Sequence, residues 1–169
     1  MKKIICIIVI TASLFLILGC NSVSKQNHNT VLFYYIHNDF KYGTESGVIT
    51  STAVTVDAEY SDYEGLLNLY FNGPTNYESI SPFPAGISLV NFQMDNNKVQ
   101  LVLSPHMATL SDSEFTVACA CLTRTVVEMT GIGTLHITIQ GPQNKENNTW
   151  TFTLNDFTYF DTVSHEQVY

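Results

Sequence analysis

The sequence predicts an α+β domain in which two amphipathic helices pack on one face of a mainly antiparallel sheet, in the order β-β-α-β-β-α-β-β. One observation behind this prediction is a pair of capped helical patterns, at residues 61–73 and 111–131. The other is a set of strand-length runs around them, in which apolar and polar positions alternate. Helices and strands with one apolar face each bury that face against the other layer, as in α+β domains.

Residues 1–19 have the order of a secretory signal peptide. Two lysines follow the initial methionine, an apolar run extends to Leu18, and Gly19 directly precedes Cys20. This end resembles the lipobox of bacterial lipoproteins, in which the cysteine is diacylated and becomes the first residue of the mature chain. Leu18 departs from it, since a small residue is more usual there. We expect Cys20 to carry lipid, such as palmitate, and to anchor the chain on the extracytoplasmic face of the cell membrane, because two acyl chains give stable anchoring.

A polar tether and two strands are expected after this leader. Residues 20–30 hold the lipidated cysteine and a polar stretch without periodicity, which spans at most ~35 Å when fully extended. The aromatic and β-branched run 31–36 has the composition of a strand, and so has the Val-, Ile- and Thr-rich run 48–58. These runs supply the first two strands of the predicted order.

The first helix is expected to begin at a capping box formed by Ser61 and Glu64. It ends at Gly73, which suits a left-handed cap, and at Pro74, which cannot continue a helix. Between these limits the apolar residues recur at helical spacing and form one face. They are Tyr63, Leu66, Leu67, Tyr70 and Phe71.

A β-hairpin with arms 87–94 and 98–104 is predicted next, after a turn-rich link. Apolar residues alternate with mostly polar ones along both arms, so one face of the hairpin should meet the core. The residues expected on that face are Val90, Phe92 and Met94 in the first arm and Val99, Leu101 and Leu103 in the second.

The second helix begins at a second capping box, Ser111 and Glu114, and ends at Gly131 or Gly133. Residues 135–139 then form a strand. The apolar stripe of this helix consists of Phe115, Ala118, Cys119, Leu122, Val126 and Met129.

Residues 142–169 are predicted to be a C-terminal strand extension packed on the same domain. Trp150, Phe152 and Leu154 alternate after a turn, and we expect the strand to continue through Phe157 and Tyr159.

The charge and the cysteines exclude several kinds of protein. The formal net charge is −8, and loss of the leader's two lysines makes it more negative, so binding to nucleic acid or directly to anionic headgroups is not expected. Cys6 leaves with the leader and Cys20 is consumed by lipid. Cys119 and Cys121 lie two positions apart in a helix, cannot bridge each other, and are too few for a zinc site. We expect two small buried thiols.

The chain has a leucine-rich helix followed by Gly-Pro, a proline-punctuated link at 81–86 that ends in a Pro-x-Gly turn, and a hairpin arm that ends in Leu103 and Ser104. Together these features resemble the GerMN family, the sporulation and spore-germination domains of Gram-positive bacteria. The resemblance covers residues 31–141. It departs at Val102, where the family typically has aspartate, and the segment after Gly141 does not follow the family pattern. The matching residues are Leu66, Leu67, 71–74, 81–86, Leu103, Ser104, 122–125 and 137–141.

This resemblance implies a non-enzymatic module that docks to other envelope proteins in sporulation or germination. GerMN domains look similar to the ring-building domains of the sporulation channel apparatus. The family carries over no catalytic residue and no cofactor, so the expected partners are the membrane, through lipid on Cys20, and another envelope or sporulation protein.

The residues themselves offer little catalytic chemistry. No two of the five histidines stand at a metal-binding spacing, and no nucleophile motif is present, so no metal, cofactor or catalytic residue is predicted. His37 and Asp39 are the nearest approach to an acid/base site, and an enzyme would depend on them. Glu64 and Glu114 are already explained as capping partners.

Exposed aromatic residues are the candidate binding residues. We expect Tyr42, Tyr77 and Tyr159 to be unable to face the core, and tyrosine is favoured at protein interfaces. An extracytoplasmic binding lipoprotein for peptidoglycan, peptide or sugar remains the alternative, because stacked aromatics also hold sugars. A concave pocket with aromatic walls would favour that alternative.

Overall fold

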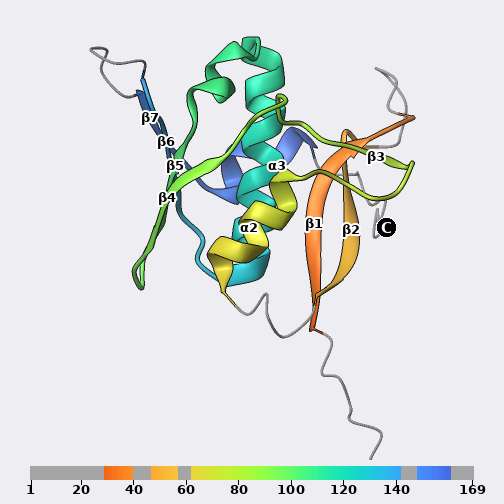
Figure 1. Ribbon diagram of the computed structural model, residues 1–169, viewed down its shortest axis with the longest axis horizontal. Helices are drawn as coiled ribbons and strands as arrows, with labels where there is room; N and C mark the ends of the chain where they lie inside the picture. The colour runs from red at the N-terminus through yellow and green to blue at the C-terminus, as the bar shows by residue number, and fades with distance from the viewer. Residues whose placement is uncertain (1–28, 40–46, 57–61, 142–147, 161–169) are drawn as a thin grey trace, which may run out of the picture.

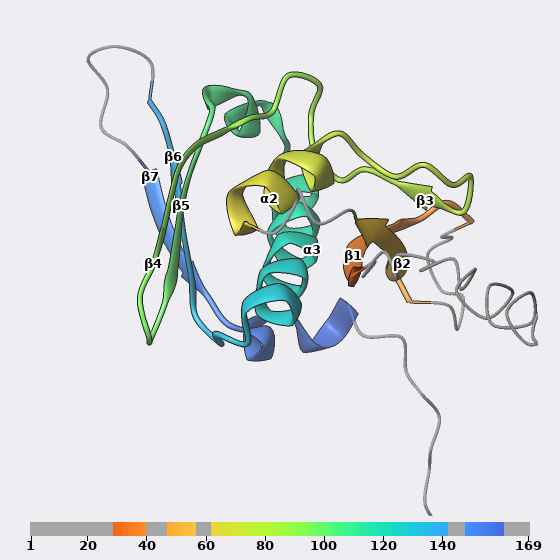
Figure 2. The ribbon, with the colours of Figure 1, turned by 60° about the horizontal axis from the view of Figure 1, so that its bottom comes forward.

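The computed structural model describes residues 29–39, 47–56, 62–141 and 148–160, and places two helices between two β-sheets. Figure 1 shows the four-stranded sheet on one side of helices α2 (Tyr63–Phe71) and α3 (Asp112–Thr130) and the three-stranded sheet on the other, and the turned view in Figure 2 agrees. The predicted α+β class is confirmed. The single sheet is not, because the strands form two separate sheets, one of three strands and one of four, with the helices between them.

The three-stranded sheet has the order β2-β1-β3. β1 (Asn29–His37) pairs antiparallel with β2 (Ile49–Val56). The sequence predicted these two strands, at 31–36 and 48–58, but not their pairing. β3 (Ser79–Ile80) adds only two residues to the far end of β1, opposite Ile36 and His37. This short strand lies inside the link that the sequence presents as turns.

The helices cover the rest of that edge of β1, which a strand would otherwise occupy. The Tyr34 backbone N–H donates to Thr125 Oγ1 at 3.0 Å, and the Tyr70 hydroxyl donates to the Tyr34 carbonyl at 2.6 Å. Both backbone groups therefore have partners from helix side chains, which protects an otherwise open sheet edge.

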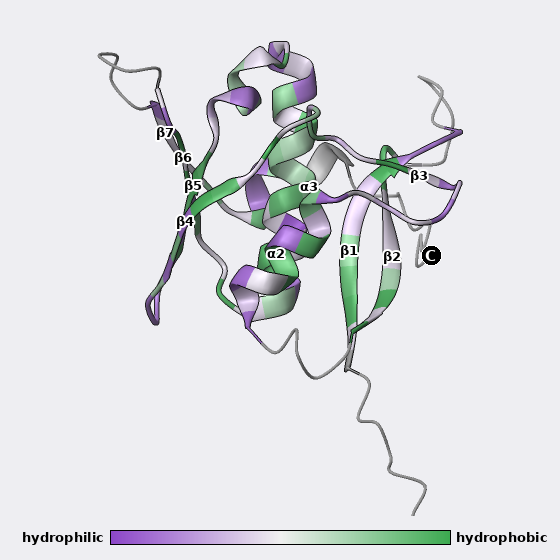
Figure 3. Cartoon of the chain, in the orientation of Figure 1, coloured by the Kyte–Doolittle hydropathy of each residue, from purple (hydrophilic) through white to green (hydrophobic). Residues whose placement is uncertain are grey.

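The four-stranded sheet has the order β4-β5-β6-β7, with β4 (Leu89–Met94), β5 (Val99–Leu103), β6 (Leu135–Ile139) and β7 (Asn148–Phe152). β5 and β6 are parallel, because α3 carries the chain back across the sheet, and the other two pairs are antiparallel. Figure 3 shows hydrophilic residues at the tip of the β4–β5 hairpin and in the loop before β3.

A register shift in β4 overturns part of the predicted hairpin. The pairing jumps between Leu89 and Asn91, and this bulge turns Val90 out of the core face that Leu89 and Phe92 share. Met94 stays on that face, opposite Val99, but lies at the end of the hairpin. Val90 and Met94, predicted to be inward, are 47% and 43% exposed, and Phe92 alone of the three is partly buried in the core. In β5 the predicted residues Val99, Leu101 and Leu103 are buried.

Helix α2 (Tyr63–Phe71) starts one residue later than predicted. Its N-cap is Asp62, whose Oδ1 accepts the Gly65 N–H at 2.7 Å, in place of the predicted box at Ser61, which lies outside the described residues. Leu66, Leu67 and Tyr70 of the predicted stripe are buried.

Helix α3 (Asp112–Thr130) has the predicted capping box. Ser111 accepts from the Glu114 N–H, and the Glu114 carboxylate accepts the Ser111 N–H at 2.9 Å. The helix is buried over more than the predicted stripe, because one sheet lies on each side of it. Its buried residues are Ala118, Cys119, Ala120, Cys121, Leu122, Thr123, Thr125 and Val126.

Gly131 ends α3 in the left-handed conformation, with φ of +70°, and an added Cβ there would meet no atom within 4 Å. We therefore expect Gly131→Ala to lower the free energy of unfolding by about 1–2 kcal/mol through backbone conformation alone. Gly133→Ala is the matched control, because its surroundings are equally open and its φ is not left-handed. Urea unfolding should show a loss at residue 131 only; equal effects at both positions would contradict this explanation.

The chain after β7 turns instead of continuing as a strand. The Asp156 carboxylate accepts the Thr153 N–H and hydroxyl at 2.7 and 2.9 Å, and two short 3₁₀ turns form η3 (Leu154–Phe160). Leu154 is 41% exposed, whereas Phe157 is buried against Phe152. The prediction of a strand through Phe157 and Tyr159 is therefore wrong. The Asp156 side chain caps a turn at Thr153, and the strand therefore ends before Leu154.

Candidate functional site

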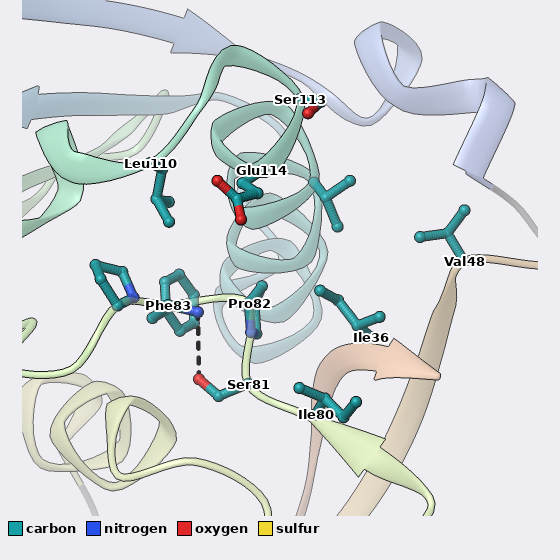
Figure 4. Close-up of a pocket in the computed structure, with 11 residues that line it drawn as sticks. Ile36, Val48, Ile80, Ser81, Pro82, Phe83, Leu110, Ser113 and Glu114 are labelled. Carbon is teal, nitrogen blue, oxygen red and sulfur yellow. Dashed lines mark hydrogen bonds between the residues drawn. The ribbon is translucent and has the colours of Figure 1, made fainter. Parts of the chain in front are cut away.

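An apolar groove of about 480 Å³ opens where β1, β2, β3 and the first half of α3 meet (Figure 4). The link between β3 and β4 forms one wall and α3 forms the opposite wall. Most of the lining is aliphatic, aromatic or proline. The lining residues are Ile36, Val48, Ile80, Ser81, Pro82, Phe83, Pro84, Leu110, Ser113, Glu114 and Val117.

The wall formed by the link is held in place from behind. Ser81 Oγ accepts the Phe83 N–H at 3.3 Å, and the two prolines restrict the backbone on either side of Phe83. The Phe83 ring packs edge-on against the rings of Phe71 and Tyr70, with centroids 5.0 and 5.2 Å away. The groove is therefore largely preformed, which reduces the entropy lost when a ligand binds.

Each polar side chain in the lining already has a partner within the chain. Ser81 Oγ holds the Phe83 N–H, and Ser113 Oγ lies 3.3 Å from Ser111 Oγ. The Glu114 carboxylate accepts from the Ser111 hydroxyl at 2.7 Å, and this bond together with the Ser111 N–H lowers the pKa of Glu114. The groove thus offers mainly apolar contact.

The residues considered for acid/base chemistry do not form a site. The Asp39 backbone N–H donates to His37 Nδ1 at 3.2 Å. This hydrogen bond closes a local turn and does not bring the Asp39 carboxylate to the imidazole. Within residues 29–39, 47–56, 62–141 and 148–160, no three His, Cys, Asp or Glu side chains are grouped to hold a metal ion.

Burial makes the two α3 thiols poor nucleophiles. It raises the pKa of both Cys119 and Cys121 to about 12, and both side chains are fully buried. They are the small buried thiols that the sequence predicted.

The three predicted binding tyrosines are not brought together by the described structure. Tyr77 is 95% exposed, in the loop before β3, where its carbonyl accepts from Asn38 Nδ2 at 2.8 Å. It does not line the groove. Tyr159 lies within η3, where the described residues do not include its side chain, and Tyr42 and Cys20 lie outside the described residues.

The sequence did not predict the groove, because its lining comes from four segments that are far apart in the chain. The proline-punctuated link was the one visible signal, and it supplies Pro82, Phe83 and Pro84. Periodicity assigns faces within an element and does not show which element ends meet.

Among the described helices, none is long and apolar enough to span a membrane.

Comparison with solved structures finds GerMN domains. The tandem GerMN domains of the sporulation protein GerM from Bacillus subtilis align over 73% of this chain with 14% identity and a TM-score of 0.54. The chain spans 43% of the length of that tandem chain. The first GerMN domain of the same protein aligns over 70% of this chain and 87% of its own length, with 13% identity and a TM-score of 0.51.

A chain from Clostridium perfringens, described as a lipoprotein, also aligns, over 76% of this chain and 90% of its own length, with 14% identity. Its TM-score of 0.47 is too low to add to the fold assignment. No protein-family model and no curated protein sequence matches the chain. The GerMN resemblance is thus confirmed at the level of the fold.

Proposed function

Because the chain has a GerMN-like fold, we propose that it is a lipid-anchored, non-enzymatic interaction module of a bacterial envelope that works in sporulation or germination. Its groove receives an apolar segment of another envelope protein. The observation that carries this proposal is the chemistry of the groove, which is preformed and apolar and whose polar side chains all have internal partners.

The lining favours a protein segment over a sugar. Sugar binding needs hydrogen-bonding groups that are directed at hydroxyls, and here Ser81, Ser113 and Glu114 are engaged elsewhere. Apolar side chains of a partner need no such groups, and each one buried contributes about 1.5–3 kcal/mol. The one carboxylate in the lining, Glu114, is the capping partner of α3, which also argues for binding over catalysis.

The groove lies at the end of β1 that is farther from the expected anchor. β1 begins at Asn29, at the end of the expected tether, and Ile36 in the groove is seven residues further along the strand, about 23 Å at the rise of an extended chain. A lipid on Cys20 would therefore not cover the groove, which stays accessible to a partner fixed in the envelope.

Photocrosslinking from the rim of the groove tests the docking. Ile80 lines the groove and is 46% exposed, while Val90 on β4 is 47% exposed and lies outside it. We expect a photoreactive phenylalanine analogue in place of Ile80, in the full chain in its native membrane, to capture one protein that the analogue at Val90 does not capture.

The capture must depend on the groove itself. Ser113→Trp, at an exposed position of the lining, should fill the groove and lower capture about tenfold, the effect of ~1.4 kcal/mol of lost binding energy, whereas Val90→Glu should not change it. Capture unaffected by Ser113→Trp would overturn the groove as the docking site.

On the same chains, Cys20→Ser should release the protein from the membrane fraction and abolish incorporation of labelled palmitate.

A binding lipoprotein for peptidoglycan, peptide or sugar is the second candidate. It is favoured by one observation, the 95% exposed ring of Tyr77, which is free to stack on a sugar face. Co-sedimentation with purified peptidoglycan that is lost in Tyr77→Ala and unaffected by Ser113→Trp would support this candidate against the first.

A further inference from the structure

β2 is an edge strand with none of the features that usually block strand addition. Within the described residues it pairs only with β1, on one side. Its eight residues, ITSTAVTV, include no charge, proline or glycine. Natural edge strands are commonly protected by charge, proline, a bulge or short length. The other edges are shorter or irregular, since β3 has two residues, β7 has five, and β4 carries a register shift.

The register shows which backbone groups of β2 face outward. The His37 N–H donates to the Val48 carbonyl at 2.9 Å, and the pairing continues with residue 35 opposite 50 and residue 33 opposite 52. In an antiparallel ladder only alternate residues bond to the neighbouring strand. The even-numbered residues of β2 therefore bond to β1, and Ser51, Ala53 and Thr55 direct their N–H and C=O groups to the open edge.

The side chains of those three residues are small and exposed. They project from the sheet face opposite that of Phe33 and Tyr35, because directly paired residues share a face. Thr52, on the other face, is fixed by hydrogen bonds to Asn76 Nδ2 at 3.0 Å and Ser79 Oγ at 3.1 Å. Thr52 thus anchors the strand to the domain, and among the described strands none pairs with its outer edge.

We propose that β2 pairs antiparallel with β2 of a second copy of this chain, about a twofold axis at Ala53. Ser51 then lies opposite Thr55 of the other copy, and Ala53 lies opposite its own counterpart. Each of these three facing pairs exchanges two backbone hydrogen bonds, so the ladder contains six. The result is one continuous sheet in the order β3-β1-β2-β2-β1-β3.

Charge and symmetry favour a second copy as the occupant. Two chains with a net charge of −8 repel each other over most surfaces, and the uncharged edge is where their backbones can approach. The outward row of Ser51, Ala53 and Thr55 is nearly symmetric about its centre, with a hydroxyl on each side of a methyl group. A twofold pairing therefore places small hydroxyl residues opposite each other, with no bulky side chain at the axis.

The pairing is also compatible with two anchors in one membrane. Asn29 pairs with Val56, three residues from Ala53, so the two copies of Asn29 are about 20 Å apart along the strands and about 14 Å apart across them. With the twofold axis along the membrane normal, both tethers can reach the same leaflet. This step alone rests on the proposed lipid anchor.

Cysteine crosslinking of the full chain in its membrane tests both the pairing and its register. Ala53→Cys should form a disulfide-linked dimer under mild oxidation, because Cα atoms of directly facing residues lie about 5.5 Å apart, within disulfide range. Ser51→Cys and Thr55→Cys should each fail alone, since each position would be about 13 Å from its own counterpart. Mixing these two variants should restore the dimer. The parent chain, whose described cysteines are buried, is the control.

The results decide between this pairing and other occupants. A dimer from Ser51→Cys alone at the yield of Ala53→Cys would overturn the register, and no dimer above the parent level would overturn the pairing. Disulfide capture of a different protein by Ala53→Cys would assign the edge to a foreign strand and would also overturn the proposal. Ala53→Lys, which puts like charges at the axis, should reduce the detergent-extracted chain to monomer mass while its circular dichroism is unchanged.

Discussion

Alanine in place of Tyr70 is expected to lower the free energy of unfolding by about 3–5 kcal/mol, the usual cost of deleting a buried aromatic ring. Tyr70 is fully buried at the centre of an aromatic cluster. Its ring centroid lies 5.2 Å from that of Phe33, 5.0 Å from that of Tyr35 and 5.2 Å from that of Phe83. The cluster joins α2 to β1 and to the wall of the groove, so the substitution should also loosen Phe83.

The Tyr70 hydroxyl has a separate role that Tyr70→Phe isolates. It donates to the Tyr34 carbonyl at 2.6 Å on the helix-covered edge of β1. Without that donor a part-buried carbonyl loses its partner, which costs about 1–3 kcal/mol. Urea unfolding should therefore rank the parent above Tyr70→Phe and Tyr70→Phe above Tyr70→Ala. Tyr77→Ala, at a 95% exposed position, is the control and should not change the midpoint. Equal stability of Tyr70→Phe and the parent would show that the hydroxyl contributes nothing.

Local signals in the sequence predicted the elements well. The capping box at Ser111 depends on residues three apart and could be identified without knowledge of the fold. The helix end was narrowed to Gly131 or Gly133, and the structure places it at Gly131. The alternation along β5 also predicted its buried residues. Each of these features is determined within one turn of helix or one strand.

The errors arose where distant segments meet. The two sheets could not be distinguished from one, because both present strands with one apolar face. The broad burial of α3 follows from lying between them, and its small residues, Ala118 to Cys121, fit that crowded position. In β4 the bulge turned Val90 away from the core, and in the C-terminal segment Asp156 ended the alternation. The groove depends on several element ends at once.

The GerMN resemblance rested on the order of glycines and prolines in this sequence, which periodicity does not supply. The solved GerMN domains share the fold of this chain at 13–14% identity. The left-handed Gly73 before Pro74 and the prolines before Gly86 fix where α2 stops and where the hairpin begins. Two of these residues, Pro82 and Pro84, also line the groove. They therefore shape the fold and form part of the candidate site.

Alkaline pH should unfold this protein through its buried thiols, and the sign follows from where the protons are held. Burial raises the pKa of Cys119 and Cys121 from about 9 to about 12, so the folded chain keeps two protons that the unfolded chain releases above pH 9. A state that binds fewer protons is favoured as pH rises. The stabilisation is therefore complete below about pH 9 and is lost progressively towards pH 12.

The size of the effect is comparable to the whole stability of a small domain. Between pH 9 and pH 12 each thiol lowers the free energy of unfolding by about 1.4 kcal/mol per pH unit. The two thiols together therefore lower it by about 4–6 kcal/mol between pH 9 and pH 11. Burial also raises the pKa of Tyr35 and Tyr70, which add to the loss only above pH 10, where tyrosine ionises in the unfolded chain. A typical domain has 5–15 kcal/mol in total, so unfolding near pH 11 is expected.

The loss of stability between pH 9 and pH 10 is therefore expected to come from the two thiols, and a double variant tests this. With a reductant present, urea unfolding of the parent chain should show stability falling by about 2–3 kcal/mol across that interval. Cys119→Ala combined with Cys121→Ala should abolish most of this slope and leave the steeper fall above pH 10, where Tyr35 and Tyr70 act. An unchanged slope in the double variant would show that other groups release the protons. The native thiols should also resist a thiol reagent until the protein unfolds, because the thiolate is the reactive form.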